Sequence, residues 1–356
     1  MLDRRDFLAV CSRFGLTTTL LPGVLWAMAD EKDGKITREM IDHAAAVADL
    51  HILDEHKAMM LESLTQYAKD YEAIYALKIP NHVAPAVVFD PVLPGMKLQT
   101  EKRPMKISAA PSVNAGAPKN LEDVAFYSVR QLAELVRSRK VSSTALTQMY
   151  LERLKRYDPV LKFVITLTED RALAKAKEAD REIAAGKYRG PLHGLPWGAK
   201  DLLAVKGYRT TWGAGGFEDQ KIDEDATVVQ RLDAAGAVLV AKLTLGALAQ
   251  GDKWFGGMTR NPWNTKQGSS GSSAGSASAT SAGCVAFAIG SETLGSISSP
   301  STRCGTTGLR PTFGFVPRTG AMALSWTMDK LGPICRAVED CAIVLSTIYG
   351  PDGHDR

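Results

Sequence analysis

The chain has 356 residues and a formal net charge of +4, from 43 lysine and arginine residues against 39 aspartate and glutamate residues. This charge is small for the length, and no run of basic residues interleaved with aromatic ones occurs, so the sequence gives no support to nucleic-acid binding. The cysteine spacing matches no zinc pattern, which argues against a metal site built on thiolates.

Residues 1–29 predict an export signal. A short basic segment precedes a moderately apolar stretch that ends in AMA at 27–29, and RRDFL at 4–8 resembles the twin-arginine type, which exports folded proteins. The stretch 14–29 is shorter than the roughly 20 apolar residues of a membrane span. We therefore expect a periplasmic or secreted protein without a stable membrane span after signal removal; a membrane anchor is the alternative.

Residues 30–120 predict a helical N-terminal extension followed by a proline-rich arm. The stretch 30–77 has helical periodicity, with Ile41 and Ala45 near one face, whereas 79–118 contains seven prolines and is typical of an irregular segment. Histidines occur in the helical part, but no acidic cluster completes a metal site there. Surface or packing roles are favoured for them.

Residues 121–356 predict a globular domain in which helices alternate with buried strands. Ser128 and Gln131 have the spacing of a capping box, with Leu132, Leu135 and Val136 facing inward. Such alternation is typical of an α/β domain whose sheet is covered on both faces. Helices are expected from Ser128, from Ser142 or Ser143 to about Tyr157, over 169–185 and from a cap at Asp225 to 235; strands are expected over 162–167 and 237–241.

The stretch 268–281 consists almost entirely of Gly, Ser, Ala and Thr and leads into the apolar run 285–289. Small residues directly before a buried strand indicate tight packing rather than a flexible linker. Beyond the strand, Ser296 follows a glycine and precedes an expected helix over 297–304. A serine at a helix N-terminus has unpaired N–H groups beside it, as an oxyanion hole requires.

A serine nucleophile needs a base, and no histidine lies between 268 and 348. Lys200 is the candidate base, because it stands with Asp201 inside an otherwise apolar run, GLPWGAKDLL at 194–203. Charged side chains are rarely buried without a partner or a task. His193 lies in the turn before this run, where a hydrogen-bonded structural role is favoured.

Several separated motifs resemble the amidase signature family: GPLHGLP at 190–196, KD at 200–201, the serine-glycine turn, GSI at 295–297 and GLRPT at 308–312. The resemblance spans about 121–353. It implies an α/β fold with a mixed β-sheet core, hydrolysis of a carboxylic amide C–N bond in small linear amides, and no metal or organic cofactor. Export argues against the related cytoplasmic role, the glutaminase subunit of a transfer-RNA amidotransferase.

The resemblance also implies a Ser-Ser-Lys triad. Ser296 is the nucleophile, Ser272 is the bridging serine after a cis peptide bond from Gly271, and Lys200 is the base that works through Ser272. The chemistry is coherent, because lysine is a base only when neutral, and burial lowers its pKa in that direction. The implied backbone donors of the oxyanion hole are the N–H groups of Thr293, Leu294, Gly295 and Ser296.

The chain departs from the family pattern at three positions. Leu294 stands where many members have a first glycine before the nucleophile, Ser298 stands where they have arginine, and Ser270 stands where glycine is usual. Because an oxyanion hole uses backbone N–H groups, a leucine side chain is expected to reshape the adjacent pocket without abolishing the hole.

Two alternatives remain at this point. Residues 271–275 fit the G-x-S-x-G of α/β-hydrolase esterases and lipases, with Ser273 as nucleophile. That motif needs a preceding strand, whereas 263–267 is polar and turn-like, and it needs a later histidine, of which only His354 remains. The second alternative is an inactive or partner-dependent fragment, because members of the resembling family continue beyond the position of Arg356. The sequence does not indicate an oligomeric state.

Four cysteines follow the expected signal: Cys284, Cys304, Cys335 and Cys341. Three of them stand beside small or apolar residues, so buried free thiols are predicted. A disulfide between Cys335 and Cys341 stays open for an oxidising compartment.

Overall fold

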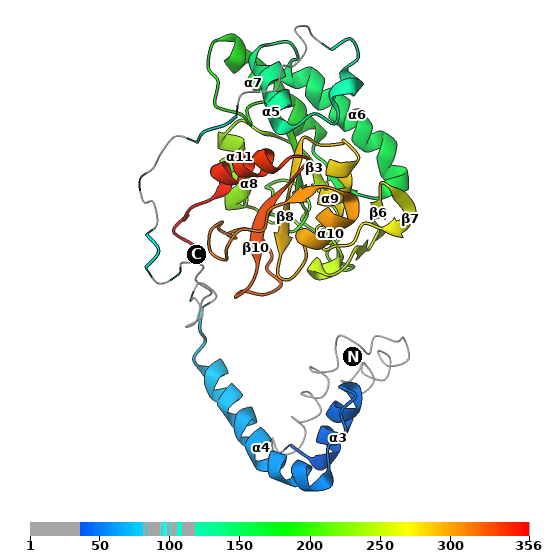
Figure 1. Cartoon of the computed structure of the whole chain (residues 1–356), viewed down its shortest axis with the longest axis vertical. Helices are drawn as coiled ribbons and strands as arrows, with labels where there is room; N and C mark the ends of the chain where they lie inside the picture. The colour runs from blue at the N-terminus through cyan, green and yellow to red at the C-terminus, as the bar shows by residue number, and fades with distance from the viewer. Residues whose placement is uncertain are drawn as a thin grey trace. The chain divides into compact units, whose positions relative to one another are not determined.

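The computed structural model describes residues 36–80 and 118–355, together with 83, 93, 95–97, 101 and 105–108. The expected export signal over 1–29 and most of the proline-rich arm lie outside the described residues. The chain divides into two compact units, Met1–Val83 and Ala84–Arg356 (Figure 1). Among the described residues, no helix combines the length and the apolar character that a membrane crossing requires.

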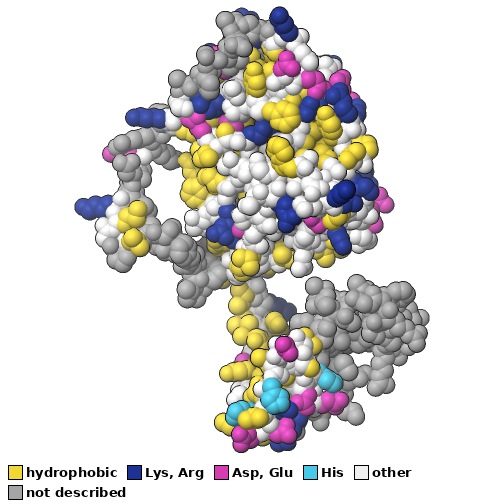
Figure 2. Space-filling view, turned by 45° about the vertical axis from the view of Figure 1, so that its right-hand side comes forward, with side chains coloured by type: hydrophobic (Ala, Val, Ile, Leu, Met, Phe, Trp, Pro, Cys, Tyr) yellow, Lys and Arg dark blue, Asp and Glu magenta, His cyan; other side chains and the backbone are white. Residues whose placement is uncertain are grey.

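The first unit contains two helices, α3 (Arg38–Val47) and α4 (Asp54–Ala76). They confirm the helical periodicity, although 48–53 interrupts the helix that was expected to run through. Ile41 and Ala45 are the buried residues among 36–80, so apolar side chains of α4 stay on the surface of this unit (Figure 2). Little apolar area is therefore removed from water here.

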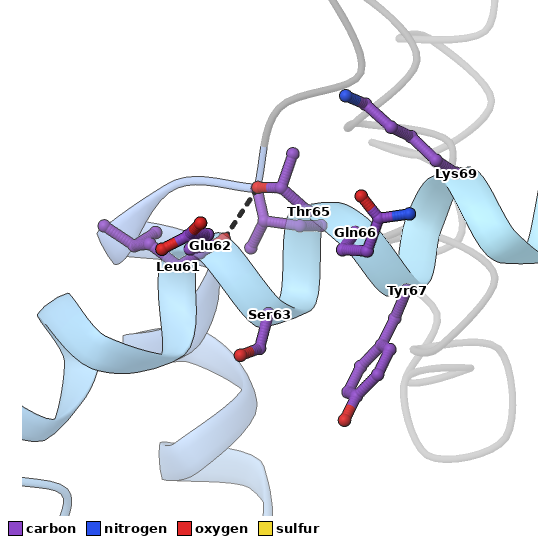
Figure 3. A pocket seen from close by; sticks show the side chains of 8 residues that line it. Leu61, Glu62, Ser63, Thr65, Gln66, Tyr67 and Lys69 are labelled. Carbon is purple, nitrogen blue, oxygen red and sulfur yellow. Dashed lines mark hydrogen bonds between the residues drawn. The ribbon is translucent and has the colours of Figure 1, made fainter.

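A pocket lies beside α4 (Figure 3). The Thr65 hydroxyl there donates to the Leu61 carbonyl at 2.7 Å, within the helix. Ser63 and Lys69 project from opposite sides of the helix, so they do not form a nucleophile and base pair. The residues that line this pocket are Ile36, Leu61, Glu62, Ser63, Thr65, Gln66, Tyr67 and Lys69.

The second unit is built on a six-stranded mixed sheet, seen at the centre of the globular part in Figure 1. Strand β2 lies parallel to both of its neighbours, β3 and β8, whereas β1, β10 and β9 pair antiparallel. The strand order is β1 (Val164–Leu167), β3 (Val238–Leu243), β2 (Pro196–Lys200), β8 (Phe287–Glu292), β10 (Lys330–Cys335) and β9 (Thr307–Gly308).

Helices cover both faces of this sheet. Trp197, Leu239 and Phe287 belong to a core on one face, whereas Val240 and Ala288 belong to a second core on the other. The structure thus confirms the predicted fold class. The helices of this unit are α5 (Val129–Arg137), α6 (Ser143–Leu161), α7 (Glu169–Ala184), α8 (Thr227–Ala234), α9 (Ala274–Ser281), α10 (Ser298–Cys304) and α11 (Val338–Ile348), with short 3-10 turns η1 (Leu121–Val124) and η2 (Ala247–Ala249).

Local signals placed most of these elements correctly. Ser128 and Gln131 form the predicted capping box, and Ser142 caps α6 by accepting from the Ala145 N–H. Asp225 does not cap α8 as predicted, because its carboxylate accepts the Lys206 N–H and Ala226 occupies the cap position. The Asp225 carboxylate thus makes a tertiary hydrogen bond to the Lys206 backbone in place of the predicted helix cap.

The expected turn at 263–267 is also wrong. Asn264–Gly268 forms β7, which pairs with β6 (Arg260–Asn261) in a small separate sheet; β4 (Lys253–Trp254) and β5 (Gly257–Met258) form another. Four residues of β7 are exposed, so its polar sequence reflects an edge position rather than a turn.

Candidate active site

Lys200 ends β2, and its side chain has no exposed surface. The ammonium nitrogen Nζ lies 2.8 Å from Ser272 Oγ, which brings together two residues of the predicted triad. Burial lowers the pKa of Lys200 to about 7, against the opposing effect of the negative charges of Asp329 and Glu292. A lysine with this pKa is partly neutral near pH 7 and can accept a proton.

Ser272 stands in a turn that tolerates only small residues. The peptide bond between Gly271 and Ser272 is cis, as the family resemblance implies. A Cβ on Gly271 would lie 1.8 Å from the Gly251 carbonyl oxygen, and one on Gly275 would lie 2.5 Å from the Thr244 nitrogen. The prediction of tight packing over 268–281 is confirmed, because the backbone approaches its neighbours where side chains are absent.

Ser296 lies in the turn between β8 and α10. Gly295 adopts φ +84°, a conformation that favours glycine, which explains the residue before Ser296. The Ser273 N–H donates to the Ser296 carbonyl at 3.1 Å and joins this turn to the one that carries Ser272. Among the described residues, no hydrogen bond links the Ser272 and Ser296 hydroxyls, so the second step of the predicted relay is not formed in this structure.

Glu292, at the end of β8, holds the backbone around Ser296. Its buried carboxylate accepts the N–H groups of Ile297 at 2.8 Å and Ser298 at 2.9 Å. Burial raises the pKa of Glu292, but the amides of Ser298, Ile297 and Gly295 outweigh this effect and lower it below its usual value. Arg310 contacts the other carboxylate oxygen at 3.2 Å. A stable negative charge therefore fixes the turn.

The predicted oxyanion-hole residues occupy this same turn. Leu294 is 79% exposed, so its side chain does not fill the site. The Thr293 hydroxyl donates to Asp329, and the Thr293 carbonyl accepts from Lys330 at 3.1 Å. The amide of Gly295 is directed at Glu292, which leaves those of Thr293, Leu294 and Ser296 as the candidate donors.

A second buried charge cluster lies beside the site. Asp201 pairs with Lys242 at 2.6 Å, and neither side chain has exposed surface. The other Asp201 oxygen accepts the N–H and the hydroxyl of Thr211 at 2.8 and 2.6 Å. Asp201 stood out in the sequence, whereas Lys242 was missed, although a lysine inside an apolar strand gives the same signal as Lys200.

Two more serines contact Lys200. Ser291 Oγ lies 2.8 Å from Nζ and Ser273 Oγ lies 3.1 Å from it. Ser273 is the nucleophile of the esterase alternative, but its hydroxyl donates to the Ser291 carbonyl and meets a lysine rather than a histidine. Ser291 was not singled out in the sequence, and Ser273 was considered only as a nucleophile and not as a partner of Lys200.

The remaining candidate residues have structural surroundings. His193 is buried, accepts the Arg189 N–H at 3.1 Å and lies 3.2 Å from Glu182, as its predicted hydrogen-bonded role requires. The cysteines at 284, 304, 335 and 341 are buried and free, which confirms the predicted thiols. In the described part of the chain, no group of His, Cys, Asp and Glu side chains has the arrangement of a metal site.

Known proteins have sequences similar to that of this chain. The sequence profile of the family described as Amidase matches residues 145–356. A glutamyl-tRNA(Gln) amidotransferase subunit of Methylococcus capsulatus is 43% identical over 228 residues, which are 63% of this chain and 47% of that protein. The corresponding protein of Geobacillus kaustophilus is 41% identical over 232 residues, 64% of this chain and 48% of that protein.

Among solved structures, the native peptide amidase from Stenotrophomonas maltophilia has 40% sequence identity and a TM-score of 0.62. The match covers 65% of this chain and 50% of that chain. The chain thus spans about half the length of the relatives it matches.

Proposed function

The chain belongs to the amidase family, and from this premise we propose that it hydrolyses the C–N bond of a small linear carboxylic amide through a serine acyl-enzyme. The observation that carries the proposal is the buried Lys200, whose pKa is lowered to about 7 and whose Nζ lies 2.8 Å from the Ser272 hydroxyl. Such a lysine supplies the base that a serine nucleophile needs, without a histidine or a metal.

In the proposed reaction, Ser296 Oγ attacks the carbonyl carbon of the amide. The Ser296 proton moves to Ser272 Oγ while the Ser272 proton moves to neutral Lys200. The C–N bond then breaks, and Lys200 returns the proton through Ser272 to the departing amine. Water then attacks the acyl carbon, and its proton passes through Ser272 to Lys200. The bond between the acyl group and Ser296 breaks as Lys200 returns that proton through Ser272 to Ser296 Oγ. The Ser272 and Ser296 hydroxyls must come into hydrogen-bond contact when substrate is bound.

The developing negative charge on the carbonyl oxygen needs donors in the turn that carries Ser296. We assign this role to the amides of Thr293, Leu294 and Ser296, because the Gly295 amide is directed at Glu292. Since Glu292 and Gly295 fix the turn before substrate arrives, these donors are preorganised.

The names of the relatives support an amide as the substrate. They include a protein named as a peptide amidase and one named as part of an amidotransferase, both of which bear names for chemistry at an amide. We favour a hydrolase acting on a free small molecule. A partner-dependent or inactive chain is the alternative, since the match covers half of each relative.

We also propose a division of the chain into an export signal over 1–29, an N-terminal extension over 30–120 and the amidase domain over 121–356, with a periplasmic or secreted location. Fusing residues 1–29 to a reporter that is active only after export tests the signal. Replacing Arg4 and Arg5 together by lysine is expected to keep the reporter inside the cell.

The catalytic proposal is tested with the full chain and a panel of aryl, fatty and peptide amides. Ser296→Ala is expected to reduce hydrolysis by about 10³-fold or more, because the nucleophile is lost. Ser299→Ala is the matched control, since Ser299 lies three residues further on and its exposed hydroxyl contacts Ser270 at 2.7 Å. Equal activity of the two variants would show that Ser296 is not the nucleophile.

A fluorophosphonate probe, which acylates activated serines, gives a readout that needs no substrate. We expect mass spectrometry to find the adduct on Ser296, and loss of the adduct in both Ser296→Ala and Lys200→Met. Labelling of Ser273 instead would support the esterase alternative.

A further inference from the structure

Lys200 has more hydrogen-bond partners than the proposed reaction uses. Its Nζ lies 2.8 Å from Ser272 Oγ, 2.8 Å from Ser291 Oγ, 3.1 Å from Ser273 Oγ and 3.3 Å from the Ser291 carbonyl oxygen. A neutral lysine has two N–H groups and one lone pair. The relay works only when the lone pair faces Ser272, so the other partners decide where it points.

Ser273 has a fixed hydrogen-bond direction. Its hydroxyl donates to the Ser291 carbonyl at 3.0 Å and accepts the Ser291 N–H at 3.1 Å. Because its single proton is committed to a carbonyl, which can only accept, Ser273 Oγ can only accept from Lys200. The contact is built into the packing, since a Cβ on Gly290 would lie 2.7 Å from Ser273 Oγ.

We infer that Ser273 and Ser291 are positioning residues that orient the Lys200 lone pair toward Ser272. Ser273 Oγ takes one N–H of the neutral amine, Ser291 Oγ takes the other, and the Ser272 hydroxyl meets the lone pair. When Lys200 is protonated, the third N–H points to Ser272 Oγ. The proton that Lys200 gains and loses is then always the one shared with Ser272. This inference rests on the proposed function.

The charged groups around Lys200 stay unchanged when either serine is replaced. Asp329 and Glu292 raise the Lys200 pKa from a distance, and Glu292 is itself paired with Arg310. Asp201, the next residue, is paired with Lys242. A change in the Lys200 titration in a serine variant therefore reports the lost hydroxyl and not a lost charge.

The test compares Ser273→Ala with Ser276→Ala. Ser276 is a matched control because it is buried in α9, the helix that Ser273 precedes as its N-cap residue. The Ser276 hydroxyl donates to the Ile289 carbonyl of β8 at 3.0 Å, without contacting Lys200. NMR of the full chain with ¹³C-labelled lysine follows the Lys200 titration, assigned by its absence in Lys200→Met. An ammonium is a stronger donor than an amine, so losing the Ser273 acceptor is expected to lower the Lys200 pKa.

Activity supplies the second readout. In Ser273→Ala the acidic limb of the pH–rate profile is expected to move to lower pH, while the plateau falls by about 10- to 100-fold because the lone pair is no longer directed. A role in folding alone would lower the plateau without moving the limb. Ser276→Ala is expected to change neither. Ser291→Ala, which keeps every backbone contact, is expected to act in the same direction and serves if Ser273→Ala does not fold.

The outcomes separate the inference from the proposed function. If Ser273→Ala and Ser291→Ala titrate and react like Ser276→Ala, the orienting role is overturned. If the wild-type chain hydrolyses no amide, the proposed function fails, and the NMR titration alone decides: a Lys200 pKa that responds to Ser273→Ala but not to Ser276→Ala supports the orienting contacts, and an unchanged one overturns them.

Discussion

Two regions of the sheet each bury a lysine, and they treat the charge differently. Lys200 ends β2 among serine hydroxyls, whereas Lys242 on the neighbouring β3 lies 2.6 Å from the Asp201 carboxylate. Burial lowers the pKa of both side chains. A carboxylate in contact compensates a buried positive charge, and hydroxyls do so only weakly. Lys242 is therefore held in an ion pair whose partner offsets part of the cost of burial, while Lys200 has no carboxylate in contact and is free to exchange a proton.

Among the variants that test this comparison, Lys200→Met is expected to have the largest effect. We expect hydrolysis to fall by about 10⁴-fold, because among the described residues no other base contacts Ser272. The protein is expected to stay folded, since the groups that lose a partner are serine hydroxyls and the Ser291 carbonyl, which still accepts from Ser273. Amide hydrolysis and thermal unfolding, measured on the same preparation, check both parts. An active variant would contradict the assignment of Lys200 as the base.

Asp201→Asn tests the other region. It leaves the buried Lys242 without its carboxylate, and breaking a buried ion pair in this way is expected to cost about 3–5 kcal/mol of unfolding free energy. Denaturant unfolding measures the loss. The control is the double variant Asp201→Asn with Lys242→Met, in which the buried charge is gone and part of the stability should return. A single variant as stable as the wild type would refute the structural role.

The two regions also differ in how far the sequence could predict them. A charge inside an apolar run pointed to Lys200 and Asp201, and small residues pointed to the turn at Ser272. The same rule applied to Lys242 but was not used. Ser273 and Ser291 carried no such signal, because what distinguishes them is the direction of hydrogen bonds between α9 and β8. Such directions arise only when the two elements pack.

The fold was predictable for similar reasons and failed where local signals conflict with tertiary contacts. Buried strands and capped helices follow from apolar runs and from Ser128 and Ser142. The predicted Asp225 cap was wrong because the distant Lys206 N–H donates to that carboxylate. The expected turn at 263–267 was wrong because an exposed edge strand carries no hydrophobic alternation.

Glu292→Gln tests how far a carboxylate that does not contact Lys200 affects its pKa. The charge of Glu292 raises the Lys200 pKa and its carboxylate holds the amides beside Ser296. Without that charge, the acidic limb of the pH–rate profile is expected to move to lower pH, and the plateau to fall by about 10-fold as the turn loosens. Arg310→Met is the control, because this half-exposed cation contacts the same carboxylate from the surface. A larger effect of Arg310→Met would contradict the role of Glu292.

The pH dependence of stability is the smallest of these effects when it is counted per pH unit. It is also the most direct measure of the Lys200 pKa in the folded protein. The unfolded chain holds the Lys200 proton up to about pH 10.5, whereas the folded chain releases it near pH 7. Between these values the unfolded state binds more protons, so the free energy of unfolding rises with pH, by about 1 kcal/mol per pH unit from this group. Below pH 7 both states hold the proton, and the slope vanishes. Subtracting the Lys200→Met curve from the wild-type curve isolates this contribution, since the other groups titrate in both proteins. A difference that stays flat from pH 7 to 10 would mean that Lys200 remains charged in the folded protein and cannot act as the base.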